Sequence, residues 1–190
     1  MSTVALKRLS IREYIRLCSD HFKRNWWQYT LPVAVVFVLQ LFIRIDVNLT
    51  ESLPDRVFIT VKGMTSNIQR GDYIAFEWPG GGPFPKGFHF VKIVAGVPGD
   101  KVRVDEERNF YIDKARSGTV LNQVSLTENQ MGRAKTHSKR GLPLELGPTG
   151  VVPTGHFYVY APHPDSLDSR YALTGWIRQE AILGKTYAIF

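Results

Sequence analysis

The sequence has 190 residues, of which 44% are hydrophobic and 22% are charged. This composition excludes a disordered chain and fits one compact domain preceded by a further segment, and the single cysteine, Cys18, excludes a framework of intramolecular disulfides. Of the formal net charge of +7, residues 1–24 carry +4 and the rest of the chain +3. Because most of the excess is concentrated in a short tail, the charge argues against a nucleic-acid partner, and none is expected.

An uncharged run of 19 residues extends from Asn25 to Ile43. As a helix it would be about 28 Å long, close to the thickness of a bilayer's hydrocarbon core. Two tryptophans lie near its beginning, as interfacial side chains do. A cleaved signal peptide is disfavoured because no small-x-small site follows the run. The predicted organisation is a basic cytoplasmic tail over residues 1–24, a transmembrane anchor over 25–45 and an extracytoplasmic domain over 46–190. For the tail, an amphipathic helix on the membrane surface and a disordered segment both remain open.

After residue 45 the pattern changes to short runs rich in β-branched and aromatic residues, separated by glycine and proline turns. The expected strands are Val57–Val61, Tyr73–Phe76, His89–Val94, Lys101–Val104, Phe110–Ile112, Phe157–Tyr160 and Ile182–Ile189. The domain is therefore predicted to be mostly β, with a barrel or a folded sheet as its core. Residues 113–150 have few periodic apolar positions, so loops or an insertion with a short hairpin are expected there.

Four segments carry the chemical information. In chain order they are Asn48-Leu-Thr-Glu-Ser-Leu-Pro54, Gly71-Asp-Tyr-Ile-Ala-Phe76, Val91-Lys-Ile-Val-Ala-Gly-Val-Pro-Gly-Asp100 and Asp165-Ser-Leu-Asp-Ser-Arg-Tyr171. They resemble the blocks of bacterial type I signal peptidases, over about residues 46–112 and 150–190. The form of the first segment looks most like the conjugative-transfer (TraF-type) branch, which matures pilin subunits. The resemblance implies a signal-peptidase-like catalytic domain, a serine-type endopeptidase, and no cofactor or metal.

In that family a serine attacks the peptide carbonyl and a lysine removes its proton. Ser52 matches the serine of the Ser-x-Pro block and Lys92 the lysine of the third block, so the resemblance implies Ser52 as nucleophile and Lys92 as general base. A lysine acts as a base only when neutral, so its pKa must fall by roughly 3 pH units, or about 4 kcal/mol, which burial can supply. Val91 and Ile93 place Lys92 in an apolar strand that can desolvate it. Thr50 matches a position whose hydroxyl, with the N–H of Ser52, binds the oxyanion.

Further along the chain, Ser166 matches a family serine whose hydroxyl holds the lysine amine in position. Asp168 and Arg170 match an acidic and a basic residue near the site, which are expected to form a supporting ion pair rather than to act in catalysis. On the surface such a pair would contribute under about 1 kcal/mol. The sequence departs from the general family at Ile93, where a basic residue usually follows the lysine, and at residues 160–162, which replace Gly-Asp-Asn.

A competing alignment also remains open. General signal peptidases read Ser-Met-x-Pro-Thr-x-x-x-Gly-Asp, and the segment Gly63–Asp72 has similar spacing, which would put glycine at the nucleophile position. The protein would then be a catalytically inactive envelope or secretion-system component. A third hypothesis is a general leader peptidase. His89, His156 and His163 show neither metal-ligand nor triad spacing and are interpreted as ordinary polar positions.

The sequence therefore predicts a membrane-anchored serine endopeptidase with a Ser52–Lys92 dyad, in the bacterial inner membrane. Its N-terminus would be cytoplasmic and its catalytic domain periplasmic. The expected partners are a membrane-inserted, pilin-like precursor protein and the lipid of the inner membrane. An acyl-enzyme would be resolved by water or, in cyclisation, by the amino end of the substrate itself.

Overall fold

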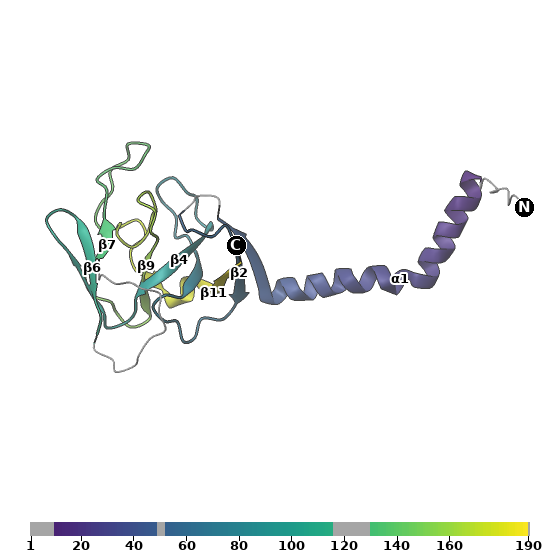
Figure 1. Cartoon of the computed structure of the whole chain (residues 1–190), viewed down its shortest axis with the longest axis horizontal. Helices are drawn as coiled ribbons and strands as arrows, with labels where there is room; N and C mark the ends of the chain where they lie inside the picture. Colours follow the sequence, from purple (N-terminus) through teal and green to yellow (C-terminus); the bar gives the residue numbers. More distant parts are fainter. Residues whose placement is uncertain (1–9, 49–51, 116–129, 190) are drawn as a thin grey trace, which may run out of the picture. The chain divides into compact units, whose positions relative to one another are not determined.

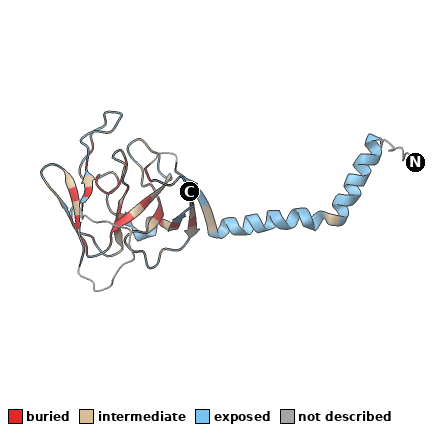
Figure 2. Ribbon diagram, viewed as in Figure 1, coloured by how far each residue is buried: buried red, intermediate tan, exposed pale blue. Residues whose placement is uncertain are grey.

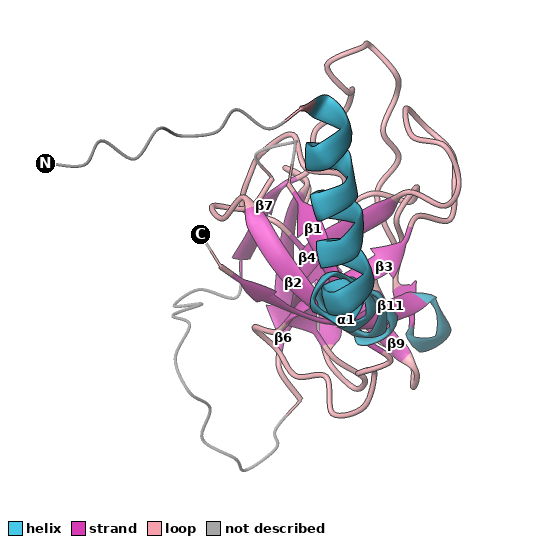
Figure 3. Cartoon of the chain, turned by 90° about the vertical axis from the view of Figure 1, so that its right-hand side faces the viewer, coloured by secondary structure: helices cyan, strands magenta, loops and turns pink. Residues whose placement is uncertain are grey.

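The computed structural model describes residues 10–48, 52–115 and 130–189. The chain divides into two units, residues 1–41 and 42–190. Helix α1 dominates the first unit, and antiparallel strands form the second (Figures 1 and 3). The predicted mostly β fold with one N-terminal helix is confirmed.

Helix α1 extends over Ile11–Phe42. Ser10 and Glu13 form a capping box at its start, in which the Ser10 N–H donates to Glu13 Oε2 at 2.8 Å and the Glu13 N–H donates to Ser10 Oγ at 3.4 Å. The backbone leaves the helical region at Asn25 (φ −117°, ψ 18°), where the tail was expected to end. No side chain of the helix is buried (Figure 2, pale blue). Within the part of the chain that the structure describes, no helix has both the length and the apolar character that crossing a membrane requires.

The larger sheet has seven antiparallel strands in the order β1-β2-β11-β3-β4-β9-β10. Their bounds are β1 Ile43–Val47, β2 Val57–Lys62, β3 Tyr73–Glu77, β4 His89–Gly96, β9 His156–Tyr160, β10 Ile177–Arg178 and β11 Ile182–Ala188. Although β1 and β4 are not neighbours in this order, Arg44 Nη1 on β1 lies 3.4 Å from His89 Nε2 on β4. The sheet therefore curls until these two strands face each other, as the predicted folded sheet requires.

A bulge in β11 contributes to this curvature. Its register against β3 shifts between Ile182 and Gly184, and bulges bend a strand. At Gly184 a side chain would overlap the backbone of the neighbouring strand, because an added Cβ would lie 1.9 Å from the carbonyl oxygen of Val61. Only glycine fits this position.

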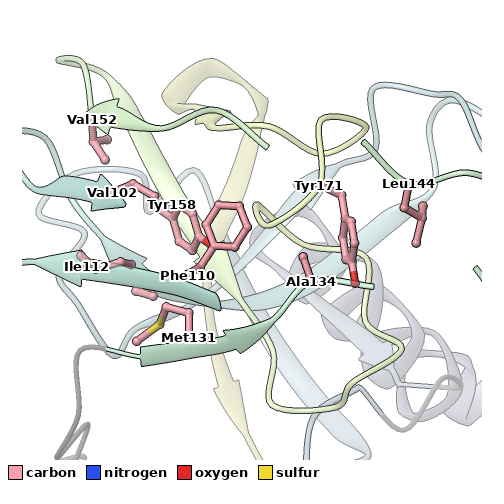
Figure 4. Close-up of a cluster of buried hydrophobic side chains, with 10 residues drawn as sticks. Val102, Phe110, Ile112, Met131, Ala134, Leu144, Val152, Tyr158 and Tyr171 are labelled. Atoms are coloured by element: carbon pink, nitrogen blue, oxygen red, sulfur yellow. The ribbon is translucent and has the colours of Figure 1, made fainter. Parts of the chain in front are cut away.

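The smaller sheet has four antiparallel strands in the order β7-β6-β5-β8. Their bounds are β5 Lys101–Val104, β6 Asn109–Asp113, β7 Gln130–Arg133 and β8 Gly150–Val151. Side chains from this sheet, from β4 and β9 and from three loops form one buried apolar cluster (Figure 4), whose labelled members are Val102, Phe110, Ile112, Met131, Ala134, Leu144, Val152, Tyr158 and Tyr171. Because β9 contributes to both this cluster and the larger sheet's own core, it joins the two sheets.

All seven expected strands are present, with ends that differ by no more than two residues. Four strands were not expected, namely β1, β7, β8 and β10. Within 113–150, β7 pairs with β6, and residues 116–129 lie outside the described part of the chain. Strand β1 begins at Ile43 and so includes the last three residues of the predicted anchor.

Candidate active site

Ser52 lies in the loop that joins the antiparallel strands β1 and β2. The next residue, Leu53, is 4% exposed and packs with Phe58 and Ala161 in a small apolar cluster. Burial of Leu53 and the fixed φ of Pro54 hold this part of the loop against the sheet. Ser52 is itself only 6% exposed, and its Oγ donates to Asn48 Oδ1 at 3.5 Å.

Lys92 lies in the middle of β4, between strands β3 and β9. Because side chains alternate along a strand, it shares a face with Phe90 and Val94. It is 4% exposed, and its Nζ donates to Ser166 Oγ at 2.8 Å and lies 5.7 Å from the centre of the Phe90 ring. Burial lowers the pKa of Lys92 from 10.5 to about 8, the Asp168 carboxylate opposes this change, and the Arg170 guanidinium adds to it.

Ser52, Lys92 and Ser166 line one cavity of about 700 Å³. Its walls come from β1 and the following loop, from residues 83–92 and from two later segments, 135–144 and 165–173. Most of the remaining lining is apolar or aromatic, including Phe84, Phe88 and Leu142. A hydroxyl and a buried amine with a lowered pKa thus share a concave, mainly apolar site, which is the setting that serine nucleophilic catalysis with a lysine base needs.

One wall of the cavity is basic. Lys135 Nζ forms a salt bridge with Asp165, and Lys139 Nζ lies 2.9 Å from the second oxygen of the same carboxylate. These two lysines hydrogen-bond to Asp165 and lower its pKa to about 2. Arg140 adds a third positive charge to the lining. Asp165 directly precedes Ser166, so this wall adjoins the partner of Lys92.

The model of the family described as signal peptidase, peptidase S26, matches residues 26–190. The chain belongs to this family. Its members are serine-type peptidases, and the match includes every described residue of the cavity.

Curated relatives include signal peptidase I of Pseudomonas aeruginosa, which is 27% identical over 143 residues, or 64% of this chain and 49% of the relative. Signal peptidase I of Pseudomonas fluorescens is 26% identical over 142 residues, with the same coverage. Signal peptidase I of Bacillus licheniformis is 26% identical over 186 residues, or 90% of this chain and 92% of the relative. The chain thus spans about half the length of the two Pseudomonas relatives and nearly all of the Bacillus one.

Of the site residues that the sequence proposed for this signal-peptidase-family chain, the structure brings Ser52, Lys92 and Ser166 to one cavity. Thr50 lies outside the described residues. Gly63, the alternative nucleophile position, is exposed in a turn after β2 with φ +75° and is not among the residues that line the cavity.

Asp168 and Arg170 form an ion pair near the site, and this pair is buried rather than at the surface. Arg170 Nε and Nη2 each donate to one oxygen of Asp168 at 2.8 Å, and the two side chains are 2% and 0% exposed. The carboxylate also accepts the Ala161 N–H at 3.2 Å. A buried, bidentate pair has stronger consequences than an exposed one, because removing either partner leaves a charge without compensation. Both residues lie behind the cavity wall rather than in it.

Sequence reasoning missed a second polar group in the cavity lining. Arg44, Asp46 and His89 line the cavity, and Arg44 Nε lies 2.8 Å from Asp46 Oδ1. Thr60 donates to the other oxygen of Asp46 at 2.6 Å. Burial and the charge of Arg44 lower the pKa of His89, while Asp46 and Glu77 oppose this. The sequence indicates β1 only through the alternation of apolar and charged residues over 43–47. This short alternation directly follows the uncharged run 25–43 and was assigned in part to the predicted anchor.

Proposed function

We propose that the protein is a serine endopeptidase in which Ser52 is the nucleophile and Lys92 the general base. The observation that carries the proposal is the burial of Lys92 in the cavity that Ser52 also lines, with its pKa lowered to about 8. A pKa near ambient pH leaves a useful neutral fraction of the amine and still allows it to return a proton to a leaving group.

In the proposed reaction, Lys92 Nζ removes the proton of Ser52 Oγ as the oxygen attacks the substrate carbonyl carbon. The hydrogen bond from Nζ to Ser166 Oγ holds the amine while its lone pair takes up the proton. The tetrahedral intermediate then collapses, the C–N bond breaks, and the leaving amine receives the proton from Lys92. Water, or an amino group of the substrate, then attacks the Ser52 ester with Lys92 again as base.

The proposed substrates are membrane-inserted precursors with small side chains near the cut, such as a conjugative pilin, whose maturation can end in cyclisation. The mainly apolar lining of the cavity suits short aliphatic side chains. The part of α1 from Leu31 to Phe42 exposes large apolar residues, and we propose that they hold the protein at the bacterial inner membrane. The basic N-terminal residues would then be cytoplasmic and the catalytic domain periplasmic.

The test begins with a serine-acylating lactam, which reports on Ser52 without any knowledge of the substrate. Intact mass spectrometry should show one covalent adduct on the wild type and none on Ser52→Ala or Lys92→Ala. A candidate pilin precursor coexpressed with the wild type should be shortened, and a further loss of 18 Da would identify the cyclic product. An unlabelled wild type that leaves the precursor intact would favour an inactive scaffold component instead.

A general signal peptidase is the second candidate, and the names of the relatives in both Pseudomonas and Bacillus favour it. The two candidates differ in substrate range. A general enzyme should restore secretion in a cell depleted of its own signal peptidase, whereas a dedicated pilin peptidase should process the pilin precursor without restoring secretion.

A further inference from the structure

We propose that Asn48 is a positioning residue, whose side-chain amide holds the loop after β1 and orients the Ser52 hydroxyl for proton transfer. This inference rests on the proposed role of Ser52. Asn48 opens the segment that contains Ser52, but the family resemblance implies no role for it.

Asn48 connects the two ends of the loop. Its backbone N–H donates to the carbonyl oxygen of Arg56 at 2.8 Å, directly after the last pair of β1 and β2. Its Nδ2 donates to two further carbonyl oxygens on the same arm, those of Leu53 and Asp55, each at 3.3 Å. One residue therefore fixes the arm that follows Ser52 at three points.

The same side chain also contacts the nucleophile. The bonds from Nδ2 to the two backbone carbonyls orient the amide, and its Oδ1 accepts a hydrogen bond from Ser52 Oγ at 3.5 Å. An isolated serine hydroxyl can occupy three staggered rotamers. An acceptor on one side of the hydroxyl biases it toward one of them, and at 3.5 Å the bond is weak enough to be broken when Lys92 takes the proton.

This arrangement limits what Asn48 can do. An amide oxygen is not a base at neutral pH, so the proton of Ser52 must pass to Lys92. The Nδ2 hydrogens already bond to Leu53 and Asp55 and so are not offered to an oxyanion. Asn48 thus acts on the reaction through Ser52, by position alone.

The first test replaces Asn48 with alanine and measures how fast the lactam acylates Ser52. We expect the limiting acylation rate to fall about 10- to 100-fold, because the hydroxyl and the loop lose their fixed partner, while the lactam concentration for half-maximal rate stays within about twofold. A matched control is Asn109→Ala. Asn109 Nδ2 donates to Asp105 Oδ2 at 2.9 Å in the turn between β5 and β6, outside the cavity lining, so this variant should acylate at the wild-type rate.

The second test, Asn48→Asp, keeps the size of the side chain but removes its hydrogen-bond donors and adds a charge near the dyad. An aspartate of the same shape cannot donate to the Leu53 and Asp55 carbonyls, and it adds a negative charge beside the cavity that holds Lys92. A nearby carboxylate favours the charged ammonium, so the pH of half-maximal acylation should rise. Partial unfolding of the loop would lower the rate at every pH without moving this midpoint.

The outcomes are distinct. A labelled wild type with an equally reactive Asn48→Ala variant overturns this inference and leaves the proposed function intact. A slow Asn48→Ala variant whose lactam concentration for half-maximal rate rises well beyond twofold also overturns it, because the cavity itself would then have changed. A wild type that is never labelled refutes the proposed function first, and the role of Asn48 with it.

Discussion

The two proposed catalytic side chains are held in different ways. Lys92 lies in the middle of β4, with paired strands on both sides and hardly any exposed surface. Ser52 lies in a loop that is held by contacts such as those of the Asn48 amide and the buried side chain of Leu53. The strand sets the pKa of the base through desolvation, whereas the loop sets the position of the nucleophile through a few local contacts. Substitutions in β4 should therefore alter the protonation of Lys92, and substitutions in the loop should alter the position of Ser52.

The largest effect is expected from Lys92→Met, which keeps the length of the side chain and removes the amine. Acylation of Ser52 should fall about 100- to 10,000-fold, the usual contribution of a general base. The free energy of unfolding at pH 7 should rise, because the fall in the pKa from 10.5 to about 8 corresponds to about 3 kcal/mol spent on burying the charged form.

Urea denaturation at pH 7 and timed lactam labelling would measure both effects. Lys101→Met, at an exposed position on β5, is the matched control and should change neither quantity. A Lys92→Met protein that is less stable than the wild type, or that is acylated normally, would contradict the role of burial described above.

In the loop, Leu53→Ala should lower the free energy of unfolding by about 3 kcal/mol, as large-to-small changes in packed cores do. It should also slow acylation about tenfold or more, since Leu53 anchors the residue next to the nucleophile. The pH dependence of acylation should stay nearly unchanged, because the side chain lost does not belong to the groups that shift the pKa of Lys92 by their charge, namely Asp168 and Arg170. Val151→Ala, at an exposed site on β8, serves as the control for stability. A shifted pH profile for Leu53→Ala would show that the loop also influences the pKa of Lys92.

The last prediction concerns the wild type, whose acylation rate should depend on pH. Only the neutral amine acts as base, so acylation should rise about tenfold per pH unit below the pKa of about 8 and level off above it. Stability is linked to the same group. Since the folded pKa is lower than the unfolded one, the unfolded chain binds more protons between pH 8 and 10.5, and this lysine's contribution to stability rises with pH across that window. In Lys92→Met this contribution should vanish, and a persisting rise would assign it to another group.

Much of the fold could be predicted because seven strands carry β-branched and aromatic runs between glycine and proline turns. The missed strands β8 and β10 have two residues each, too few to show a period. Strand β7 reads Gln-Met-Gly-Arg and lacks an alternating pattern. Each of these is specified by its partner strand rather than by its own residues.

Strand β1 departs from the usual pattern, because two of its apolar side chains are more exposed than its charged ones. Ile45 and Val47 are 65% and 58% exposed, whereas Arg44 and Asp46 are half-buried, although all four residues line the cavity. Alternation alone predicts that the apolar face turns inward. Here the curl of the sheet gives the polar face its partners, His89 and Thr60, and no pattern within five residues can show that.

The sequence by itself determined the mostly β domain, the N-terminal helix and the membership of the signal peptidase family, because these depend on local periodicity and on ordered blocks of residues. It also supplied the candidate serine and lysine. Only the tertiary structure decided that Lys92 is desolvated next to Ser166, that Asp168 and Arg170 form a buried pair, and that Asn48 holds the serine loop. The reason is physical, since desolvation, ion pairing and hydrogen-bond geometry depend on groups that are distant in the chain and meet only when the sheets close.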